Sequence, residues 1–221
     1  NTVGLNECNG TINENFIHYN HTGLIGCDGI IERNIIERSY KKGLWKCDAL
    51  ISKNKIRHNN EGGLHDCQGT IEGNLISDNR SHEGAGILQC NGLIRNNVIQ
   101  DNRAYQGFRE EAGHVETWGG GLSRCSGTII NNIIAGNVAS AEAQCGTTWP
   151  YPYFPGSATA LGGGLYGCDG VIKNNIIVNN NAGAYIYSID GSDCGWSSEK
   201  GDGLFNCTGE ISYCNIPEGD R

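Results

Sequence analysis

One skeleton is repeated eight times in this chain of 221 residues, and each copy is centred on a cysteine. The fullest copy, residues 162–180, reads GGGLYGCDGVIKNNIIVNN. A glycine stands four residues before each of these cysteines, and isoleucines stand four and nine residues after it. A period of about twenty residues with strict apolar columns is typical of a solenoid, because one unit cannot bury its apolar face alone and must stack on a copy of itself. The column cysteines are Cys8, Cys27, Cys47, Cys67, Cys90, Cys125, Cys168 and Cys207.

An asparagine column runs between the two isoleucine columns, seven residues after each cysteine. Glycine and asparagine interrupt the apolar residues every five or so positions, which leaves no room for a helix and predicts three short strands per unit. Asparagine tolerates the left-handed backbone of tight bends, and a stacked column of its amides can satisfy itself by hydrogen bonding. Cys214 takes the eighth place of a column formed by Asn15, Asn34, Asn54, Asn74, Asn97, Asn132 and Asn175.

This pattern resembles the right-handed parallel β-helix repeat proteins, in particular the Gly-rich and Asn-rich bacterial secreted or surface group. The resemblance covers the whole chain and implies an all-β fold, with residues 1–221 forming one β-solenoid domain of about eight rungs. At about 4.8 Å per rung the rod would be about 38 Å long. The resemblance leaves the function open, because pectate-lyase-like enzymes, uronate epimerases, adhesins and surface proteins share this architecture.

The spacing between column cysteines is 19, 20 and 20 residues at first and then widens to 23, 35, 43 and 39. The large insertions all follow the last asparagine of a repeat, so they should stack on one side of the rod as a lateral lobe. We expect three irregular loops, over residues 103–118, 138–161 and 181–202. Their aromatic side chains are predicted to bury against one another as a small satellite core.

The cysteine column favours reduced thiols that act as small core residues over a partly bridged ladder. The sequence has no Cys-x-x-Cys pair, so we expect no zinc site, and no other metal or cofactor is assigned. Cys145 and Cys194 differ, because they lie in consecutive insertions. We predict a disulfide between them, which would place the protein in an oxidising extracellular or cell-surface setting.

The insertions also carry aromatic and acidic residues of the kind that contact sugars, since rings stack on sugar faces and carboxylates bind hydroxyl groups. Catalysis would need a carboxylate pair or a base with a calcium-binding cluster, drawn from Glu110, Glu111, Glu116, His114 and the aspartates Asp190, Asp193 and Asp202. The chain lacks an Asp-rich strand motif of the pectinase type, so no catalytic residue is assigned. The candidate glycan contacts are Trp118, Trp149, Tyr151, Tyr153, Trp196, Asp190 and Asp193.

Charge and hydropathy limit the partners. A net charge of −8 and a pI near 5.2 argue against nucleic acid. No apolar run approaches the ~20 residues of a membrane span. The sequence enters inside one rung and leaves inside another, so the chain is either a piece of a longer β-helix or a subunit whose end rungs meet.

Our first hypothesis is therefore an extracellular, non-catalytic structural solenoid. Its subunits would stack end to end into a fibre or surface assembly by main-chain pairing of the first and last rungs. The alternatives are a polysaccharide-active lyase, hydrolase or epimerase, and an adhesin that binds glycan through the lobe. Either alternative would make a polysaccharide the partner.

Overall fold

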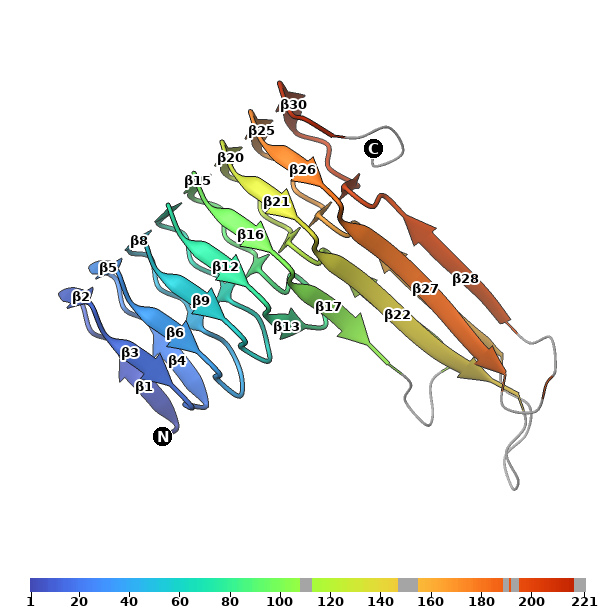
Figure 1. Cartoon of the computed structure of the whole chain (residues 1–221), viewed down its shortest axis with the longest axis horizontal. Helices are drawn as coiled ribbons and strands as arrows, with labels where there is room; N and C mark the ends of the chain where they lie inside the picture. The colour runs from blue at the N-terminus through green and yellow to red at the C-terminus, as the bar shows by residue number, and fades with distance from the viewer. Residues whose placement is uncertain (108–112, 147–154, 189–190, 192–194, 217–221) are drawn as a thin grey trace.

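The fold is a parallel β-helix, as predicted. The structure is a computed structural model that describes residues 1–107, 113–146, 155–188, 191 and 195–216. Every regular element in these residues is a β-strand, and each strand pairs in parallel with its equivalent one rung away. The rungs stack into an inclined coil, from which longer strands project on one side of the C-terminal half (Figure 1).

Three parallel sheets form the walls of the coil. Sheet A contains β1 (Val3–Asn6), β4 (Thr22–Ile25), β7 (Leu44–Trp45), β10 (Leu64–His65), β14 (Ile87–Leu88), β19 (Leu122–Ser123), β24 (Leu165–Tyr166) and β29 (Leu204–Phe205). Sheet B contains β2 (Thr11–Asn13), β5 (Ile30–Glu32), β8 (Leu50–Ser52), β11 (Thr70–Glu72), β15 (Leu93–Arg95), β20 (Thr128–Ile130), β25 (Val171–Lys173) and β30 (Glu210–Ser212). Sheet C contains β3 (Phe16–His18), β6 (Ile35–Glu37), β9 (Lys55–Arg57), β12 (Leu75–Ser77), β16 (Val98–Gln100), β21 (Ile133–Ala135) and β26 (Ile176–Val178).

The bends between sheets use single residues in the left-handed backbone conformation. In the second rung, for example, Gly26, Arg33 and Arg38 have φ angles of 58°, 54° and 54°. Gly26 and Arg33 stand directly before Cys27 and Asn34, and Arg38 stands directly before Ser39, which takes the place of Asn59 one rung earlier. The expectation that the column asparagines themselves adopt this conformation is wrong by one residue, because their side chains are needed inside the coil.

The column asparagines form a continuous ladder, which is buried from Asn34 to Asn175. The Oδ1 atom of each accepts hydrogen bonds from the backbone N–H and the side-chain amide of its counterpart one rung earlier, at 2.9 and 3.0 Å where Asn74 donates to Asn97. The Nδ2 atom of Asn97 also donates to the Ile71 carbonyl at 2.9 Å. At the last rung Cys214 replaces the asparagine, and the Asn175 Nδ2 atom donates to the Cys214 Sγ atom at 3.9 Å. The ladder thus satisfies buried polar groups along the whole coil.

A second asparagine ladder lies at the corner where the insertions leave the coil. Asn59 N–H donates to the Asn79 Oδ1 atom at 3.1 Å, and the same pattern continues to Asn180. Each long insertion begins directly after a member of this ladder, and Asn102 is fully buried. The ladder therefore fixes the base of the lobe. Its members are Asn59, Asn79, Asn102, Asn137 and Asn180.

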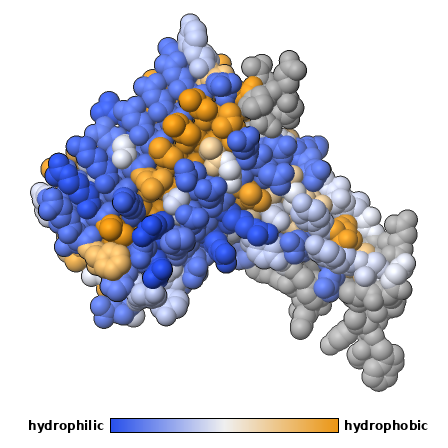
Figure 2. Space-filling model, viewed as in Figure 1, coloured by the Kyte–Doolittle hydropathy of each residue, from blue (hydrophilic) through white to orange (hydrophobic). Residues whose placement is uncertain are grey.

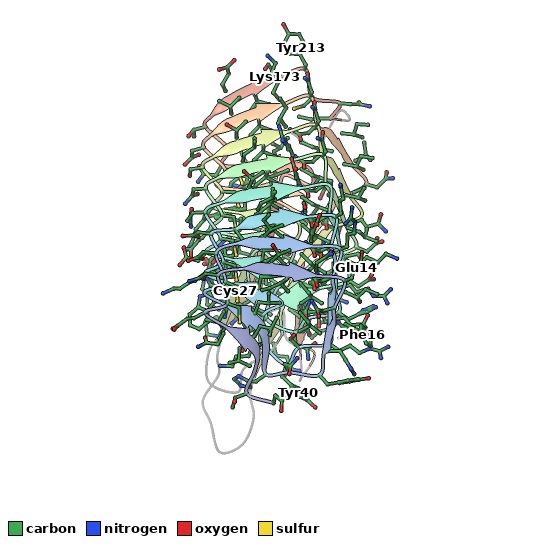
Figure 3. All side chains as sticks on the ribbon, turned by 90° about the vertical axis from the view of Figure 1, so that its left-hand side faces the viewer. Glu14, Phe16, Cys27, Tyr40, Lys173 and Tyr213 are labelled. Atoms are coloured by element: carbon green, nitrogen blue, oxygen red, sulfur yellow. The ribbon has the colours of Figure 1, made fainter. Side chains whose placement is uncertain are left out.

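The eight column cysteines are free thiols, which confirms the favoured prediction of a reduced ladder. They point into the coil, as Cys27 shows in Figure 3, and most donate to the carbonyl oxygen two residues earlier. Hydrogen bonding to Cys27 lowers the pKa of Cys47, but hydrogen bonding to Cys67 and burial outweigh that effect and raise it to about 12. Burial raises the pKa of Cys67 well above its usual range. The Cys47 and Cys67 thiols therefore remain protonated at neutral pH.

The insertions stack on one side as expected, but most of their described residues form strands rather than irregular loops. Sheet D contains β13 (Arg80–Ser81), β17 (Arg103–Gln106), β22 (Val138–Cys145) and β27 (Asn181–Ser188). Sheet E contains β18 (His114–Trp118), β23 (Gly156–Leu161) and β28 (Gly195–Lys200). Each insertion runs outward in sheet D and returns in sheet E, so the two sheets make the projecting lobe (Figure 1).

The core of the lobe is made of alanine. Ala139, Ala141 and Ala143 on β22 face Ala158 and Ala160 on β23, and all five are at most 1% exposed. Alternating small residues let two sheets approach closely without aromatic filling. The predicted aromatic satellite core is wrong for the described residues, because Tyr105, Tyr185, Tyr187 and Trp196 are 38–59% exposed.

The outer surface of sheet C carries an apolar stripe. One outward position of this sheet is occupied by Phe16, Ile35, Lys55, Leu75, Val98, Ile133 and Ile176 in successive rungs. Ile133 and Ile176 are 41% and 43% exposed, and apolar side chains gather over this part of the molecule in Figure 2. Within the described residues no helix is long and apolar enough to cross a membrane.

Candidate functional sites on the lateral lobe

The outer face of sheet D presents three exposed tyrosines. Alternation along β17 and β27 turns Ala104, Ala182 and Ala184 toward the lobe core, and it turns the tyrosines to solvent. The exposed fraction is 38% for Tyr105, 48% for Tyr185 and 53% for Tyr187. Rings held on a paired sheet lose little conformational freedom when a ligand stacks on them.

Charged groups accompany these rings. The Tyr105 hydroxyl donates to the Glu142 Oε2 atom at 3.1 Å, and the Arg103 guanidinium lies 4.9 Å from the centre of the Tyr105 ring. Partial burial and the Glu142 carboxylate raise the pKa of Tyr105 above its usual value. The face therefore combines phenol groups with the Glu142 carboxylate and the guanidinium groups of Arg103 and of its register partner Arg80. This is a chemistry suited to hydroxyl-rich ligands.

The outer face of sheet E brings one residue from each insertion into a single row. His114, Ser157 and Trp196 are register partners on β18, β23 and β28. The His114 Nδ1 atom lies 2.5 Å from the Ser157 hydroxyl oxygen, and its Nε2 atom lies 2.7 Å from the Glu116 Oε1 atom. The Trp196 ring centre is 6.4 Å from that of His114. A hydroxyl, an imidazole and a carboxylate thus form one hydrogen-bonded chain.

A third group lies where sheet E meets sheet A. The rings of Trp118, Tyr166 and Phe205 follow one another along the rod, with centres 6.1 and 6.2 Å apart. The Arg124 guanidinium lies 5.7 Å from the Trp118 ring and pairs with Glu83 at 3.0 Å. The three rings and Glu83 are partly buried and only Arg124 is exposed, so we interpret the group as packing between lobe and coil.

Of the predicted glycan contacts, only Trp118 and Trp196 are among the described residues. Trp118 and Trp196 lie on the same face of sheet E, at opposite ends of its strands. Asp202 is engaged in a hydrogen bond from the Ala182 amide at 2.8 Å, and no cluster of three or more His, Cys, Asp or Glu side chains among the described residues could hold a metal ion. Seven other candidates lie outside the described residues: Glu110, Glu111, Trp149, Tyr151, Tyr153, Asp190 and Asp193.

The predicted disulfide also reaches beyond the described part of the chain. Cys145 is 1% exposed at the end of β22, whereas Cys194 lies outside the described residues. The pairing stays a prediction.

Sequence reasoning missed Ser157 and Glu142, and it did not place Tyr105, Tyr185 and Tyr187 on one face. The signal was present as alternation: VASAEAQC and GSATAL place a small residue at every second position. Such alternation is typical of a strand with one buried face. It would have identified the lobe as two sheets and the intervening residues as outward facing.

The C-terminal end of the coil has an open concavity of about 540 Å³. Its lining includes Cys207, Ile211, Cys214 and Ile216, which continue the internal columns of the coil. Ile211 is 40% exposed here, whereas the equivalent Ile172 one rung below is fully buried. Tyr213 projects beyond this last rung, with the Lys173 amine 5.3 Å from its ring centre (Figure 3).

Comparison with known proteins gives no relative. The chain matches no protein-family model, and no curated protein or solved structure is significantly similar to it. Any assignment of function therefore depends on the geometry of the chain itself.

Proposed function

We propose that this chain is a structural β-solenoid that contributes a rigid rod to an extracellular or cell-surface assembly and associates end to end through its terminal rungs. The observation that carries the proposal is the open concavity of the last rung, where internal columns of the coil meet solvent. The exposed Ile211 in its lining occupies a column whose isoleucine is fully buried in every interior rung.

The first rung carries the matching columns. Leu5, Cys8, Ile12 and Ile17 stand in the same columns as Leu204, Cys207, Ile211 and Ile216. A second copy placed one rung-spacing beyond β29 and β30 would continue each column with the same residue type. The edge strands would gain main-chain hydrogen bonds by β-augmentation. A further stretch of solenoid from a longer chain would cover the same edge, so the experiment must separate the two.

The oligomeric state of the chain distinguishes these two cases, and two substitutions at positions of equal exposure show which surface is used. Ile211, at the open end, is 40% exposed, and Ile133, on the side of sheet C, is 41% exposed. In sedimentation velocity of the 221-residue chain we expect the parent protein and Ile133→Asp to form elongated oligomers, and Ile211→Asp to remain a monomer. A monomeric parent protein would contradict end-to-end stacking and favour continuation of the solenoid within a longer chain. Loss of assembly in Ile133→Asp alone would instead indicate side-by-side association.

Glycan binding by the lobe is a second candidate function. It is favoured by the three exposed tyrosines on the outer face of sheet D, together with Glu142 and Arg103. Sugar rings would stack on the tyrosines while the charged groups bind hydroxyls. A flat, exposed platform fits a polysaccharide chain better than a small enclosed ligand.

Titration calorimetry with soluble xylan and dextran tests this candidate. We expect binding to weaken about tenfold when either Tyr185 or Tyr187 is changed to alanine, which corresponds to about 1.4 kcal/mol for each ring. Tyr40→Ala is the matched control, because Tyr40 is 65% exposed but lies away from the lobe. Equal binding by the control and the lobe variants would exclude the sheet D tyrosines as the glycan-binding surface.

A further inference from the structure

The row on the outer face of sheet E contains a serine with unusual surroundings. Ser157 is only 8% exposed although it points outward, because His114 and Trp196 stand on either side of it. Its hydroxyl is 2.5 Å from the His114 Nδ1 atom. Both rings come from strands that neighbour β23, so sheet register holds the serine between them.

The carboxylate of Glu116 defines the direction of the hydrogen bonds. The His114 Nε2 atom lies 2.7 Å from the Glu116 Oε1 atom, and an ionised carboxylate can only accept. The Nε2 atom therefore carries the hydrogen, and Nδ1 is left as an acceptor for the Ser157 hydroxyl. This is the arrangement in which a general base activates a nucleophile and a third group orients the base.

We propose that Ser157 is a nucleophile for acyl transfer, with His114 as its general base and Glu116 as a positioning residue. The Ser157 Oγ atom attacks the carbonyl carbon of an ester while its proton passes to His114 Nδ1. The carbon–oxygen bond to the alcohol then breaks, and the alcohol leaves with that proton. Water next attacks the acyl-serine, giving up a proton through His114 to Ser157, and a carboxylic acid is released.

The surroundings of Ser157 limit the substrate class. The His114 and Trp196 ring centres are 6.4 Å apart on either side of Ser157, which is 8% exposed, so we expect only a small acyl group such as acetyl to reach its hydroxyl. Trp196 is 59% exposed and offers its ring as a stacking surface for the alcohol part, as a sugar or an aromatic ring would require. We therefore expect small-acyl esters of sugars or phenols to react. The site lies on the opposite face of the lobe from the tyrosine platform, so each of the two proposals can be tested independently of the other.

The hydrogen bond of the Ser157 backbone N–H limits the rate of acyl transfer that we expect. The Ser157 N–H donates to the Gly113 carbonyl oxygen within sheet E, so it is unable to stabilise an oxyanion. Removing a single oxyanion donor lowers turnover by about 10²–10³-fold in enzymes that have one. We expect slow turnover, and covalent labelling of the serine is the more sensitive measure.

A fluorophosphonate probe tests the proposal, with the labelled residue located by peptide mass spectrometry. We expect Ser157 to be labelled, and p-nitrophenyl acetate to release p-nitrophenol in a burst of about one equivalent. Ser157→Ala should abolish both signals, whereas Ser140→Ala should keep them. Ser140 is the matched control because it is 4% exposed and faces outward on sheet D. Circular dichroism should show both variants folded.

The partners of Ser157 are tested in the same assay. His114→Gln should slow labelling by about 10²–10⁴-fold, the usual contribution of a general base. Glu116→Gln should also slow it, and Glu116→Asp, which keeps the carboxylate, should recover part of the rate, which a merely structural role would not predict. An unlabelled parent protein, or labelling that persists in Ser157→Ala, would overturn the proposal.

Discussion

The coil and the lobe are built from the same kind of parallel sheet but from different interiors. The coil encloses isoleucine, leucine and cysteine columns with an asparagine ladder between them. The lobe encloses alanine, with Val115 and the partly buried Ile186 as its larger apolar side chains. Burial contributes about 0.8 kcal/mol per methylene, so each coil residue stabilises its rung far more than an alanine stabilises the lobe.

Because of this difference, we expect the coil to supply the stability of the protein and the lobe to supply its contacts with ligands. The coil is stabilised by its buried columns, and its outer surface carries polar residues beside the apolar stripe of sheet C. The lobe buries little, and its two outer faces carry exposed tyrosines on one side and the Ser157–His114–Glu116 row on the other. The second asparagine ladder joins the regions, because each long insertion starts beside one of its members. Substitutions in each region should therefore act on different properties.

The largest effect is expected inside the coil. Ile94 is fully buried between Ile71 and Ile129 on neighbouring rungs. Ile94→Ala should lower the free energy of unfolding by about 2–5 kcal/mol, since it removes apolar contacts and leaves a cavity. Urea denaturation measures this effect. Ile133→Ala is the exposed control and should change stability by only about 0.5 kcal/mol.

Breaking the asparagine ladder should rank second. In Asn97→Ala the Asn74 backbone N–H loses its acceptor at 2.9 Å, while the Ile71 carbonyl loses a donor at 2.9 Å. Each buried group left unpaired costs about 1–3 kcal/mol. Urea denaturation should show the loss. Asn91→Ala in the same rung is the control and should change little, because the Ser126 N–H that loses its acceptor at 2.8 Å is exposed and can bind water. Equal stability of the two variants would contradict a stabilising ladder.

Overpacking the lobe should have a smaller and local effect. Ala141 is fully buried between sheets D and E, and a leucine there would force the sheets apart at a cost of about 1–3 kcal/mol. Hydrogen exchange of Ala141→Leu should rise in β22, β23 and β27 and stay unchanged in sheet B. Gln144→Leu, which faces outward on β22, is the control. Faster exchange throughout the coil would show that the two regions unfold as one unit.

The thiol ladder predicts a pH dependence confined to the coil. The pKa of Cys47 is about 12 in the folded protein against 9.0 for a free thiol. Above pH 9 the unfolded chain loses this proton while the folded chain keeps it, so stability is full below pH 9 and falls as the pH rises toward 12. The loss is about 1.4 kcal/mol per pH unit for one thiol. Urea denaturation should show a shallower decline for Cys47→Ala.

The coil could be predicted from sequence because its constraints repeat. Eight copies of one residue pattern identify the buried positions, and Cys27 or Ile31 can be assigned inward without coordinates. The lobe could not be predicted so well, since its alternation spans only four to eight residues in each strand and its core residue, alanine, carries a weak apolar signal. The neighbours of Ser157 depend on register between strands separated by 43 residues in sequence, which no local pattern reveals.

Electron microscopy of the purified chain tests the central claim most directly, because it shows coil and lobe together. We predict unbranched filaments with a smooth core formed by the coil and lateral projections formed by the lobes. The projections should recur about every 38 Å along the axis, or at a nearby value set by the junction, as eight rungs of about 4.8 Å require. Single short rods at high protein concentration, or sheets joined side by side, would contradict end-to-end assembly.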